Sequence, residues 1–289
     1  MTVRHLDRLL SPQSIAVVGA SDRAGSPGRV VMERLAAGGY EGAVWPVNPK
    51  HDVVAGLPSV PEPAALPGTP DLAIVATPAA AVAGVIDALG RAGNRAAVVV
   101  SAGLDRDTPA LAATLEAAHG HGLRLLGPDS LGLMRPALKL NAGLAHRLAL
   151  PGRLAFLSQS GAIVGSVVDW AAAHGIGFSH VVALGVQADV GVHDLLDVLA
   201  TDTESRAILM YLEGIEDAAA FMSAARAAAR VKPVIALKSG RHAEGARAAT
   251  SHTGAMAGTD ALFDAAFERA GVLRIHTLEE MFDAAEVLD

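Results

Sequence analysis

The chain has 289 residues, 51% hydrophobic and 18% charged, which is enough apolar material for buried cores in two domains of ordinary size. A formal net charge of -7 at pH 7, without clustered lysine and arginine, argues against a nucleic-acid-binding surface. The absence of cysteine excludes disulfides, thiolate metal sites and a cysteine nucleophile, and it fits a cytoplasmic protein.

Neither a secretory signal nor a membrane span is predicted. Residues 1–10 carry charged side chains among their leucines and lack the apolar core of a signal peptide. The most apolar window, residues 71–90, approaches membrane length, but Asp71, Pro78 and Asp87 interrupt it. This window instead predicts a buried strand followed by a helix, and we expect no membrane partner.

The first half of the chain alternates short β-rich runs with helical patterns. Its strands are expected at Ser14–Gly19, Ala43–Val47, Asp71–Ala76, Ala96–Ser101 and Arg124–Leu126. Its helices are expected at Gly28–Gly38, Ala79–Arg91 and Thr108–Gly120. Because polar residues do not interrupt the apolar runs, the strands should be covered on both faces, as in a parallel sheet between helix layers. The pattern predicts a doubly wound α/β domain.

A break in the pattern precedes a second α/β half. Prolines and glycines interrupt the periodicity between Gly127 and Gly152, and domains are predicted at residues 1–148 and 149–289. Strands of the second half are expected at Leu154–Leu157, His180–Leu184, Ala207–Leu212, Val234–Leu237 and Val272–Ile275. Its helices are expected at Gly161–His174, Val192–Leu199, Asp217–Arg230, Thr259–Ala270 and Leu278–Leu288. This alternation favours a flavodoxin-like sheet.

Glycine- and hydroxyl-rich loops follow the predicted strands of the first half, at the sheet edge where open α/β domains bind ligands. The loop from Gly19 to Arg29 could hold a phosphate on its amides. It is neither a G-x-G-x-x-G fingerprint nor a Walker A loop, which disfavours NAD or ATP binding by motif. Three more loops could line one crevice for an elongated nucleotide-containing ligand: Val47–Lys50, Ala76–Pro78 and Ser101–Gly103. Ordinary turn chemistry is the alternative for each of them.

Two strand ends of the second half carry candidate phosphate chemistry. Ser158–Ala162 lies between a strand and a helix, so helix-terminal amides and the Ser160 hydroxyl could bind an anion. An ordinary serine N-cap would use the same residues. Glu213 ends another strand, and its carboxylate could bind one nitrogen of His252 and leave the other as a nucleophile. A solvent-facing glutamate is the alternative.

His252 is the candidate for the chemistry. It lies in Ser251-His252-Thr253-Gly254, where Thr253 can hydrogen-bond a phosphate and Gly254 lets a ligand approach the backbone. An imidazole there could be phosphorylated, whereas a loop histidine that caps a helix is the plain alternative. The other histidines form no spaced ligand set and no H-E-x-x-H motif is present, so a metal centre is disfavoured.

The order of these motifs resembles that of the ADP-forming acyl-CoA synthetases, a superfamily that includes the succinyl-CoA synthetase alpha subunit. The motifs that carry the resemblance are Ser14–Gly28, Val47–Lys50, Ser101–Gly103, Gly127–Gly132, Ser158–Ala162, Tyr211–Gly214, Lys238–Arg241 and Ser251–Gly258. They span nearly the whole chain. The resemblance implies a Rossmann-like CoA-binding domain followed by a flavodoxin-like succinyl-CoA-ligase domain.

The resemblance also implies a reaction in which a carboxylic acid, CoA and ATP are interconverted with acyl-CoA, ADP and phosphate through an acyl phosphate and a phosphohistidine. His252 matches the phosphorylated histidine, and Glu213 matches the residue that orients it. The phosphate-binding residues implied are Ser160, Gly161, Thr253 and Gly254. The CoA-binding residues implied are Gly19, Ser21, Arg23, Gly28, Arg29, Asn48, Lys50, Thr77, Ser101 and Gly103.

Two residues depart from the family pattern, and one domain of the complete ligase has no match. Asp129 and Val186 stand where the family usually carries asparagine, and a carboxylate at position 129 would repel an acyl phosphate. No segment resembles an ATP-grasp domain, so we expect a partner subunit or domain that binds ATP or ADP with Mg²⁺, in an oligomer. A second flavodoxin-like portion could follow residue 289. The alternative function is a non-catalytic CoA- or acyl-CoA-sensing module that regulates a partner such as an acetyltransferase.

Overall fold

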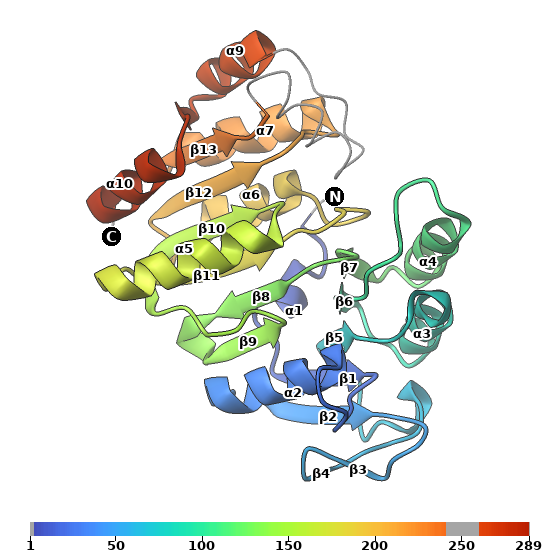
Figure 1. Ribbon diagram of the computed structural model, residues 1–289. Helices are drawn as coiled ribbons and strands as arrows, with labels where there is room; N and C mark the ends of the chain where they lie inside the picture. Colours follow the sequence, from blue (N-terminus) through green and yellow to red (C-terminus); the bar gives the residue numbers. More distant parts are fainter. Residues whose placement is uncertain (1–2, 241–259, 289) are drawn as a thin grey trace. The chain divides into compact units, whose positions relative to one another are not determined.

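The computed structural model describes residues 3–240 and 260–288, which form two compact units (Figure 1). Among the described residues, the first unit is Arg4–Leu148 with Leu184–Val190, and the second unit is Val3, Ala149–Ala183, 191–240 and 260–288. Each unit contains parallel strands flanked by helices, which confirms the predicted fold class. In the described part of the chain, no helix is long and apolar enough to cross a membrane.

The first unit is centred on five parallel strands in the order β2-β1-β5-β6-β7. Their bounds are β1 (Ser14–Val18), β2 (Ala43–Val47), β5 (Leu72–Val75), β6 (Ala96–Val99) and β7 (Arg124–Leu126). The chain begins this sheet at β1, adds β2 on one side and then adds the other three strands on the other side. The strand order therefore reverses between β1 and β5.

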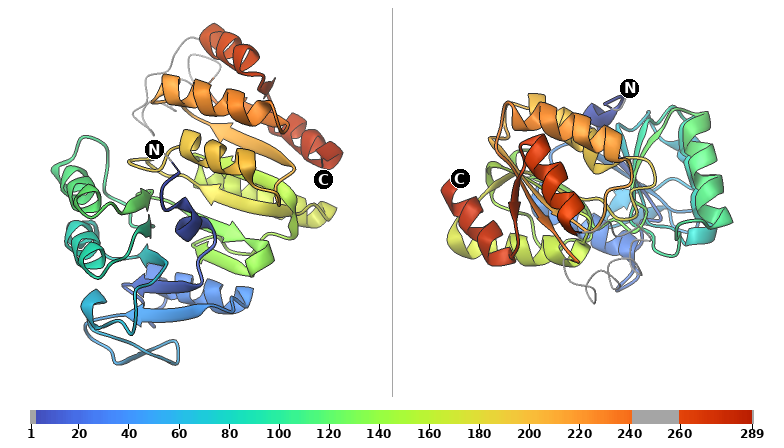
Figure 2. Two further views of the ribbon diagram at one scale, coloured as in Figure 1. Left: turned by 180° about the vertical axis from the view of Figure 1, so that it is seen from behind. Right: turned by 90° about the horizontal axis from the view of Figure 1, so that it is seen from above.

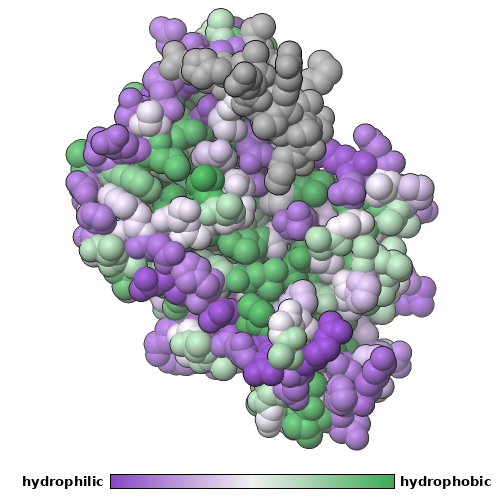
Figure 3. All heavy atoms as spheres, in the orientation of Figure 1, coloured by the Kyte–Doolittle hydropathy of each residue, from purple (hydrophilic) through white to green (hydrophobic). Residues whose placement is uncertain are grey.

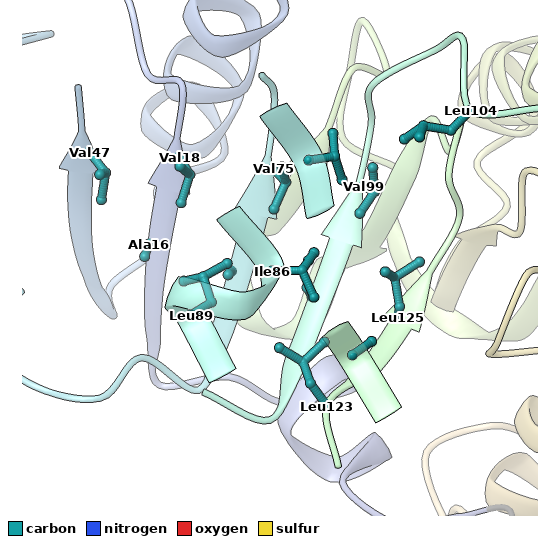
Figure 4. Packing of buried hydrophobic residues seen from close by; sticks show 14 residues of the cluster. Ala16, Val18, Val47, Val75, Ile86, Leu89, Val99, Leu104, Leu123 and Leu125 are labelled. Atoms are coloured by element: carbon teal, nitrogen blue, oxygen red, sulfur yellow. The ribbon is translucent and has the colours of Figure 1, made fainter. Parts of the chain in front are cut away.

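Helices cover both faces of this sheet. They are α1 (Leu6–Leu10), α2 (Pro27–Gly38), α3 (Ala79–Arg91) and α4 (Pro109–Gly120). Figures 1 and 2 show α3 and α4 on one side of the sheet and α1 and α2 on the other. Ile86 and Leu89 of α3 pack in one buried cluster with Val75 and Val99 of the strands (Figure 4). Ile74, which points to the opposite face, is also fully buried, which explains why the apolar runs are uninterrupted.

The region between Gly127 and Gly152, where the sequence showed only an interrupted periodicity, contains an antiparallel hairpin that was not predicted. The hairpin joins β8 (Gly132–Arg135) and β9 (Leu140–Gly143) through the 3₁₀ turn η2 (Pro136–Leu138). A Cβ on Gly132 would lie 2.4 Å from the Cα of Gly143, so the paired strands require the glycines that suggested a break. The sequence also gave no sign of α1, of η1 (Pro63–Ala65) or of the hairpin of β3 (Val53–Val54) and β4 (Leu57–Pro58).

The second unit has five parallel strands in the order β14-β13-β12-β10-β11. Their bounds are β10 (Pro151–Ser158), β11 (Phe178–Ala183), β12 (Ala207–Leu212), β13 (Val234–Lys238) and β14 (Leu273–Ile275). Numbered within the unit, this is the order 2-1-3-4-5 of flavodoxin-like folds. The prediction of a flavodoxin-like domain is confirmed, and the order reverses between β10 and β12.

Helices flank these strands on both faces. They are α5 (Gly161–His174), α6 (Val192–Thr201), α7 (Ala218–Ala229), α9 (Asp260–Ala270) and α10 (Leu278–Leu288). Trp170 of α5 stacks on Phe282 of α10 with ring centroids 4.1 Å apart, while α6 and α7 pack together on the other face (Figures 1 and 2). On the face drawn in Figure 3, hydrophilic and hydrophobic residues are interspersed within both units.

Residues 184–190 directly follow β11 in the sequence but pack within the first unit. Arg124 Nε lies 3.1 Å from an Asp189 carboxylate oxygen, and the same oxygen accepts a hydrogen bond from the Leu125 amide at 2.7 Å. The Val190 amide donates to the Leu125 carbonyl at 3.1 Å. Both charged side chains are largely buried, so one ion pair and two backbone contacts hold this segment beside β7.

We expect Asp189→Ala to lower the free energy of unfolding by about 3 to 5 kcal/mol, because it leaves a buried guanidinium without its carboxylate. Glu33→Ala is the matched control, since Glu33 pairs with Arg29 at an exposed position, and it should change stability by at most about 1 kcal/mol. Urea denaturation of both variants measures the difference. Equal effects would show that the Asp189 pair does not stabilise the first unit.

Candidate functional site

Each unit has one place where neighbouring parallel strands bracket a reversal of strand order, which is where open α/β sheets bind ligands. In the first unit these strands are β1 and β5, and in the second unit they are β10 and β12. Most of the predicted site residues lie in the loops that follow these strands or the adjacent ones.

Glycines bring backbones together at the β1–β5 edge. A Cβ on Gly19 would lie 2.8 Å from the Ala76 carbonyl oxygen, and one on Gly28 would lie 1.9 Å from the Gly19 carbonyl oxygen. Gly103 has a φ of +84°, so the loop after β6 contains a left-handed residue. In the loop after β1, the Ser21 hydroxyl accepts a hydrogen bond of 3.1 Å from the Arg23 backbone amide. The start of α2 therefore lies directly against the turn after β1, at an approach that only glycine permits.

Three predicted residues with polar side chains lie in the same set of loops. Asn48 donates to the Ala20 carbonyl at 2.7 Å and accepts from the Lys50 amide at 2.8 Å. The Ser101 hydroxyl donates to the Thr77 carbonyl at 2.5 Å. The Thr77 hydroxyl oxygen is buried and has no hydrogen-bond partner among the described residues. Burial without a partner is unfavourable, so this hydroxyl has unused hydrogen-bonding capacity at the sheet edge.

The predicted basic residues of this edge differ in how they are held. Arg29 donates to Glu33 at 2.7 Å and to the Asp22 carbonyl at 2.8 Å, and the hydrogen bond to Glu33 raises the pKa of Arg29. Arg23 and Lys50 are exposed, and neither forms a side-chain ion pair with a residue that the structure describes. Arg23 and Lys50 are thus the cations most open to an anionic ligand, while Arg29 fixes the loop.

In the second unit, the turn after β10 leaves the start of α5 without a serine cap. The Ser158 hydroxyl accepts from the Ser160 amide at 3.1 Å and donates to the Ser160 carbonyl at 2.8 Å. Ser160 is the N-cap residue of α5, yet its own side chain makes no capping hydrogen bond. The Ser160 hydroxyl and the amides from Gly161 onward are placed where a helix start favours an anion, so an ordinary cap does not account for them.

A buried amide connects this turn to the loop that carries Glu213. Gln159, which is 5% exposed, accepts at Oε1 from the amides of Glu213 and Gly214, the latter at 2.9 Å. Its side-chain Nε2 donates to the Gly214 carbonyl at 2.8 Å, and the backbone N–H of Gln159 donates to the Tyr211 carbonyl at 3.1 Å. Ser160 and Glu213 thus follow paired strands, and Gln159, to which the sequence prediction gave no role of its own, joins their loops.

A lysine lies on the next strand of the same edge. Lys238 pairs in register with Leu212, and its ammonium donates to the Ser239 carbonyl at 2.5 Å and lies 4.6 Å from the Phe263 ring centroid. Burial is the main cause that lowers the pKa of Lys238, and the nearby Glu213 carboxylate opposes it. The second unit thus holds a buried positive charge close to the Glu213 loop.

His252, Thr253 and Gly254 lie outside the described residues. The predicted contact of Glu213 with His252, and the phosphate-binding role of Thr253 and Gly254, stay predictions.

The two departures from the family pattern lie close together in the first unit. Asp129 is exposed and has a left-handed φ of 53°, a conformation that aspartate and asparagine tolerate better than most residues. The Val186 amide donates to the Pro128 carbonyl at 2.9 Å, a contact that needs no particular side chain. A Cβ on the neighbouring Gly185 would lie 2.2 Å from the Pro128 carbonyl oxygen. The backbone thus accommodates aspartate and valine at these positions.

Two family models match the chain. The model described as a CoA binding domain matches residues 13–136, and the model described as a succinyl-CoA ligase like flavodoxin domain matches residues 151–288.

The chain is also similar over nearly all of its length to parts of longer proteins. It is 39% identical to ADP-forming acetate–CoA ligase I of Archaeoglobus fulgidus, over 98% of this chain and 42% of that protein. It is 38% identical to the alpha subunit of ADP-forming acetate–CoA ligase I of Pyrococcus furiosus, over 98% of this chain and 63% of the subunit. The solved structure of dinucleotide forming acetyl-coenzyme A synthetase 1 of Ca. Korarchaeum cryptofilum, in complex with phosphate and ADP, matches with a TM-score of 0.93 and 36% identity, over 98% of this chain and 62% of that one. The chain therefore spans less than two thirds of each of these relatives.

We expect Gly28→Ala to destabilise the first unit by about 1 to 3 kcal/mol, because its Cβ would overlap the Gly19 carbonyl and push α2 from the β1 turn. Gly84→Ala is the control: Gly84 lies in α3, and its Cβ would meet nothing within 4 Å. Alanine should stabilise that helix by about 0.5 to 1 kcal/mol. Thermal unfolding should show a lower melting temperature for Gly28→Ala and a higher one for Gly84→Ala. A stabilised Gly28→Ala variant would contradict the close packing of Gly28 against the Gly19 carbonyl.

The two tyrosines of the chain should ionise late in the folded protein. Burial raises the pKa of Tyr40 to about 12 and also raises that of Tyr211. A raised folded-state pKa stabilises the fold below the ordinary value of 10.0, and this contribution is lost as the pH rises through the folded value. Phenolate absorbance at pH 10 should show less ionisation in the folded chain than in denaturant, where both groups titrate near that pH. Tyr211→Phe should remove one of the two groups, and a folded-state midpoint near 10 would contradict the burial.

Proposed function

The chain belongs to the superfamily of ADP-forming acyl-CoA synthetases, and we propose that it carries the CoA-binding and phosphohistidine-bearing part of such an acid–thiol ligase. The proposed reaction converts a carboxylic acid, CoA and ATP into acyl-CoA, ADP and phosphate. It passes through an acyl phosphate and a phosphorylated histidine. The observation that carries the proposal is the adjacency of the uncapped α5 start and the Glu213 loop at the strand-order reversal of the second unit.

In the proposed relay, one nitrogen of His252 attacks the phosphorus of the acyl phosphate, and the carboxylate of the acid leaves. Glu213 would accept the N–H of the other ring nitrogen and so keep the attacking nitrogen unprotonated. The Ser160 hydroxyl and the amides from Gly161 onward, with Thr253 and Gly254, would stabilise the charge on the transferring phosphoryl group. A nitrogen–phosphorus bond is labile, which suits a group that stores phosphate between two transfers.

The first unit would bind CoA, which supplies the thiol that accepts the acyl group. The residues fit a phosphorylated nucleotide: close backbone approaches at Gly19 and Gly28, the buried Thr77 hydroxyl, and the exposed cations Arg23 and Lys50. The other proposed contacts are Ser21, Arg29, Asn48, Ser101 and Gly103. Of these, Arg29, Asn48 and Ser101 also hold the loops in place through the hydrogen bonds described above.

ATP chemistry would come from a partner. Relatives of this chain include a protein named as an alpha subunit, and this chain covers 63% of it. We propose that an ATP-grasp subunit or domain binds ATP or ADP with Mg²⁺ and exchanges phosphate with His252, in a cytoplasmic oligomer. The acid substrate would be small, like the acetate of the relatives' names.

The phosphorylation half of the reaction can be tested on this chain alone. We expect incubation with acetyl-CoA and radiolabelled inorganic phosphate, without ATP, to give a protein-bound label that is lost in acid and kept in base. His252→Ala should abolish the label because it removes the attacking nitrogen. His276→Ala, at an exposed position on the loop before α10, is the control and should label like the parent. Label that persists in His252→Ala would assign the phosphate to another residue.

A further inference from the structure

We infer that Gln159 is a positioning residue for phosphoryl transfer, which sets Glu213 relative to the α5 start. The inference rests on the proposed function and deepens it by naming the residue that joins the two parts of the site. Gln159 directly precedes the N-cap residue Ser160, and its side chain bonds the Glu213 loop. A shift of Gln159 would therefore displace both the start of α5 and that loop.

Three hydrogen bonds from the Gln159 side chain fix the backbone that carries Glu213. Its Oε1 accepts from the amides of Glu213 and Gly214, and its Nε2 donates to the Gly214 carbonyl at 2.8 Å. The peptide groups on both sides of Gly214 and the amide of Glu213 are thereby held by one planar group. The Glu213 carboxylate then has only its side-chain torsions left to adjust.

The position needs an amide. A carboxamide presents an acceptor and a donor on one carbon, and this loop offers two N–H groups and one carbonyl. Glutamate would keep the acceptor, lose the donor to the Gly214 carbonyl and add a negative charge beside Glu213. Leucine has a similar size but would leave all three backbone groups, two of them in buried hydrogen bonds, without the side-chain partner they have here.

Further hydrogen bonds fix the turn after β10, from which the Gln159 side chain extends. The backbone N–H of Gln159 donates to the Tyr211 carbonyl at 3.1 Å. The Ser158 hydroxyl accepts from the backbone N–H of Ser160 and donates to the Ser160 carbonyl. The β10 turn is thus fixed to its own strand and to β12, and the Gln159 side chain extends from a fixed base. Errors of about 1 Å in a catalytic group can reduce rates by about 100-fold, so loss of this tie should be visible in the rate of phosphoryl transfer.

The test compares label formation from acetyl-CoA and labelled inorganic phosphate in the full chain and its variants. We expect Gln159→Leu and Gln159→Glu to slow labelling by about 10- to 100-fold while CoA affinity, measured by calorimetry, stays the same. Ser166→Ala is the control, since Ser166 is an exposed α5 residue whose hydroxyl bonds only the Ala162 carbonyl among the described residues, and it should label at the parent rate. Gln159→Glu retains the shape of the side chain, so a folded variant is available if Gln159→Leu does not fold.

A double-mutant cycle separates positioning from a general structural role. If Gln159 acts through Glu213, then Gln159→Glu combined with Glu213→Gln should label no more slowly than Glu213→Gln alone, within about twofold. Multiplied effects, or labelling of the Gln159 variants at the parent rate, would overturn the inference.

Amide hydrogen exchange tests the tie independently of activity. The Glu213 and Gly214 amides should exchange slowly in the parent and rapidly in Gln159→Leu, while the central amides of β12 stay protected. Rapid exchange in the parent would contradict the hydrogen bonds from the Glu213 and Gly214 amides to Gln159 Oε1. A parent chain that shows slow exchange and no label would instead contradict the proposed function and, with it, the positioning role of Gln159 in phosphoryl transfer.

Discussion

The reversal of strand order between two adjacent parallel strands is the constraint on which both candidate sites depend. In each unit the order is 2-1-3-4-5, so the loops after the first and third strands meet at one edge of the sheet although many residues separate them in the sequence. At that edge, backbone groups bond across the reversal: the Ala76 amide donates to the Val18 carbonyl at 2.8 Å, and the Gln159 backbone amide donates to the Tyr211 carbonyl at 3.1 Å.

The two units solve the packing of that edge in different ways. In the first unit, glycines remove side chains, so that Gly28 lies against the Gly19 carbonyl and the loops approach each other through backbone alone. In the second unit, the Gln159 side chain fills the gap and its amide satisfies three backbone groups. The first unit therefore relies on backbone contacts, whereas the second uses one buried side chain to fix two loops.

The two units also differ in how exposed their nearby cations are. The cations at the edge of the first unit, Arg23 and Lys50, are exposed and remain adaptable to a polyanion. Near the Glu213 loop, the cation is the buried Lys238, held by the Ser239 carbonyl and the face of Phe263. Arg274, which also lies near Lys238, is bound to Asp260 and Asp264. A buried charge acts at a lower local dielectric than a charge in solvent, so the influence of Lys238 on the neighbouring Glu213 loop is larger than that of an exposed lysine.

The sequence by itself determined the parallel strands of both units and most of the helices that flank them, because uninterrupted apolar runs and helical periodicity are local consequences of burial. The elements β2, β7, β12, α3, α5 and α10 have the predicted bounds. It also indicated the loops at the strand ends, since glycine and hydroxyl residues cluster there. Tertiary structure alone decided that Gly132 and Gly143 pair in a hairpin, that Asp189 joins Arg124 in the first unit, and that Gln159 ties Ser160 to Glu213. Each of these contacts joins residues whose partners are set by the fold of distant segments, and no local pattern encodes a partner 11, 65 or 54 positions away.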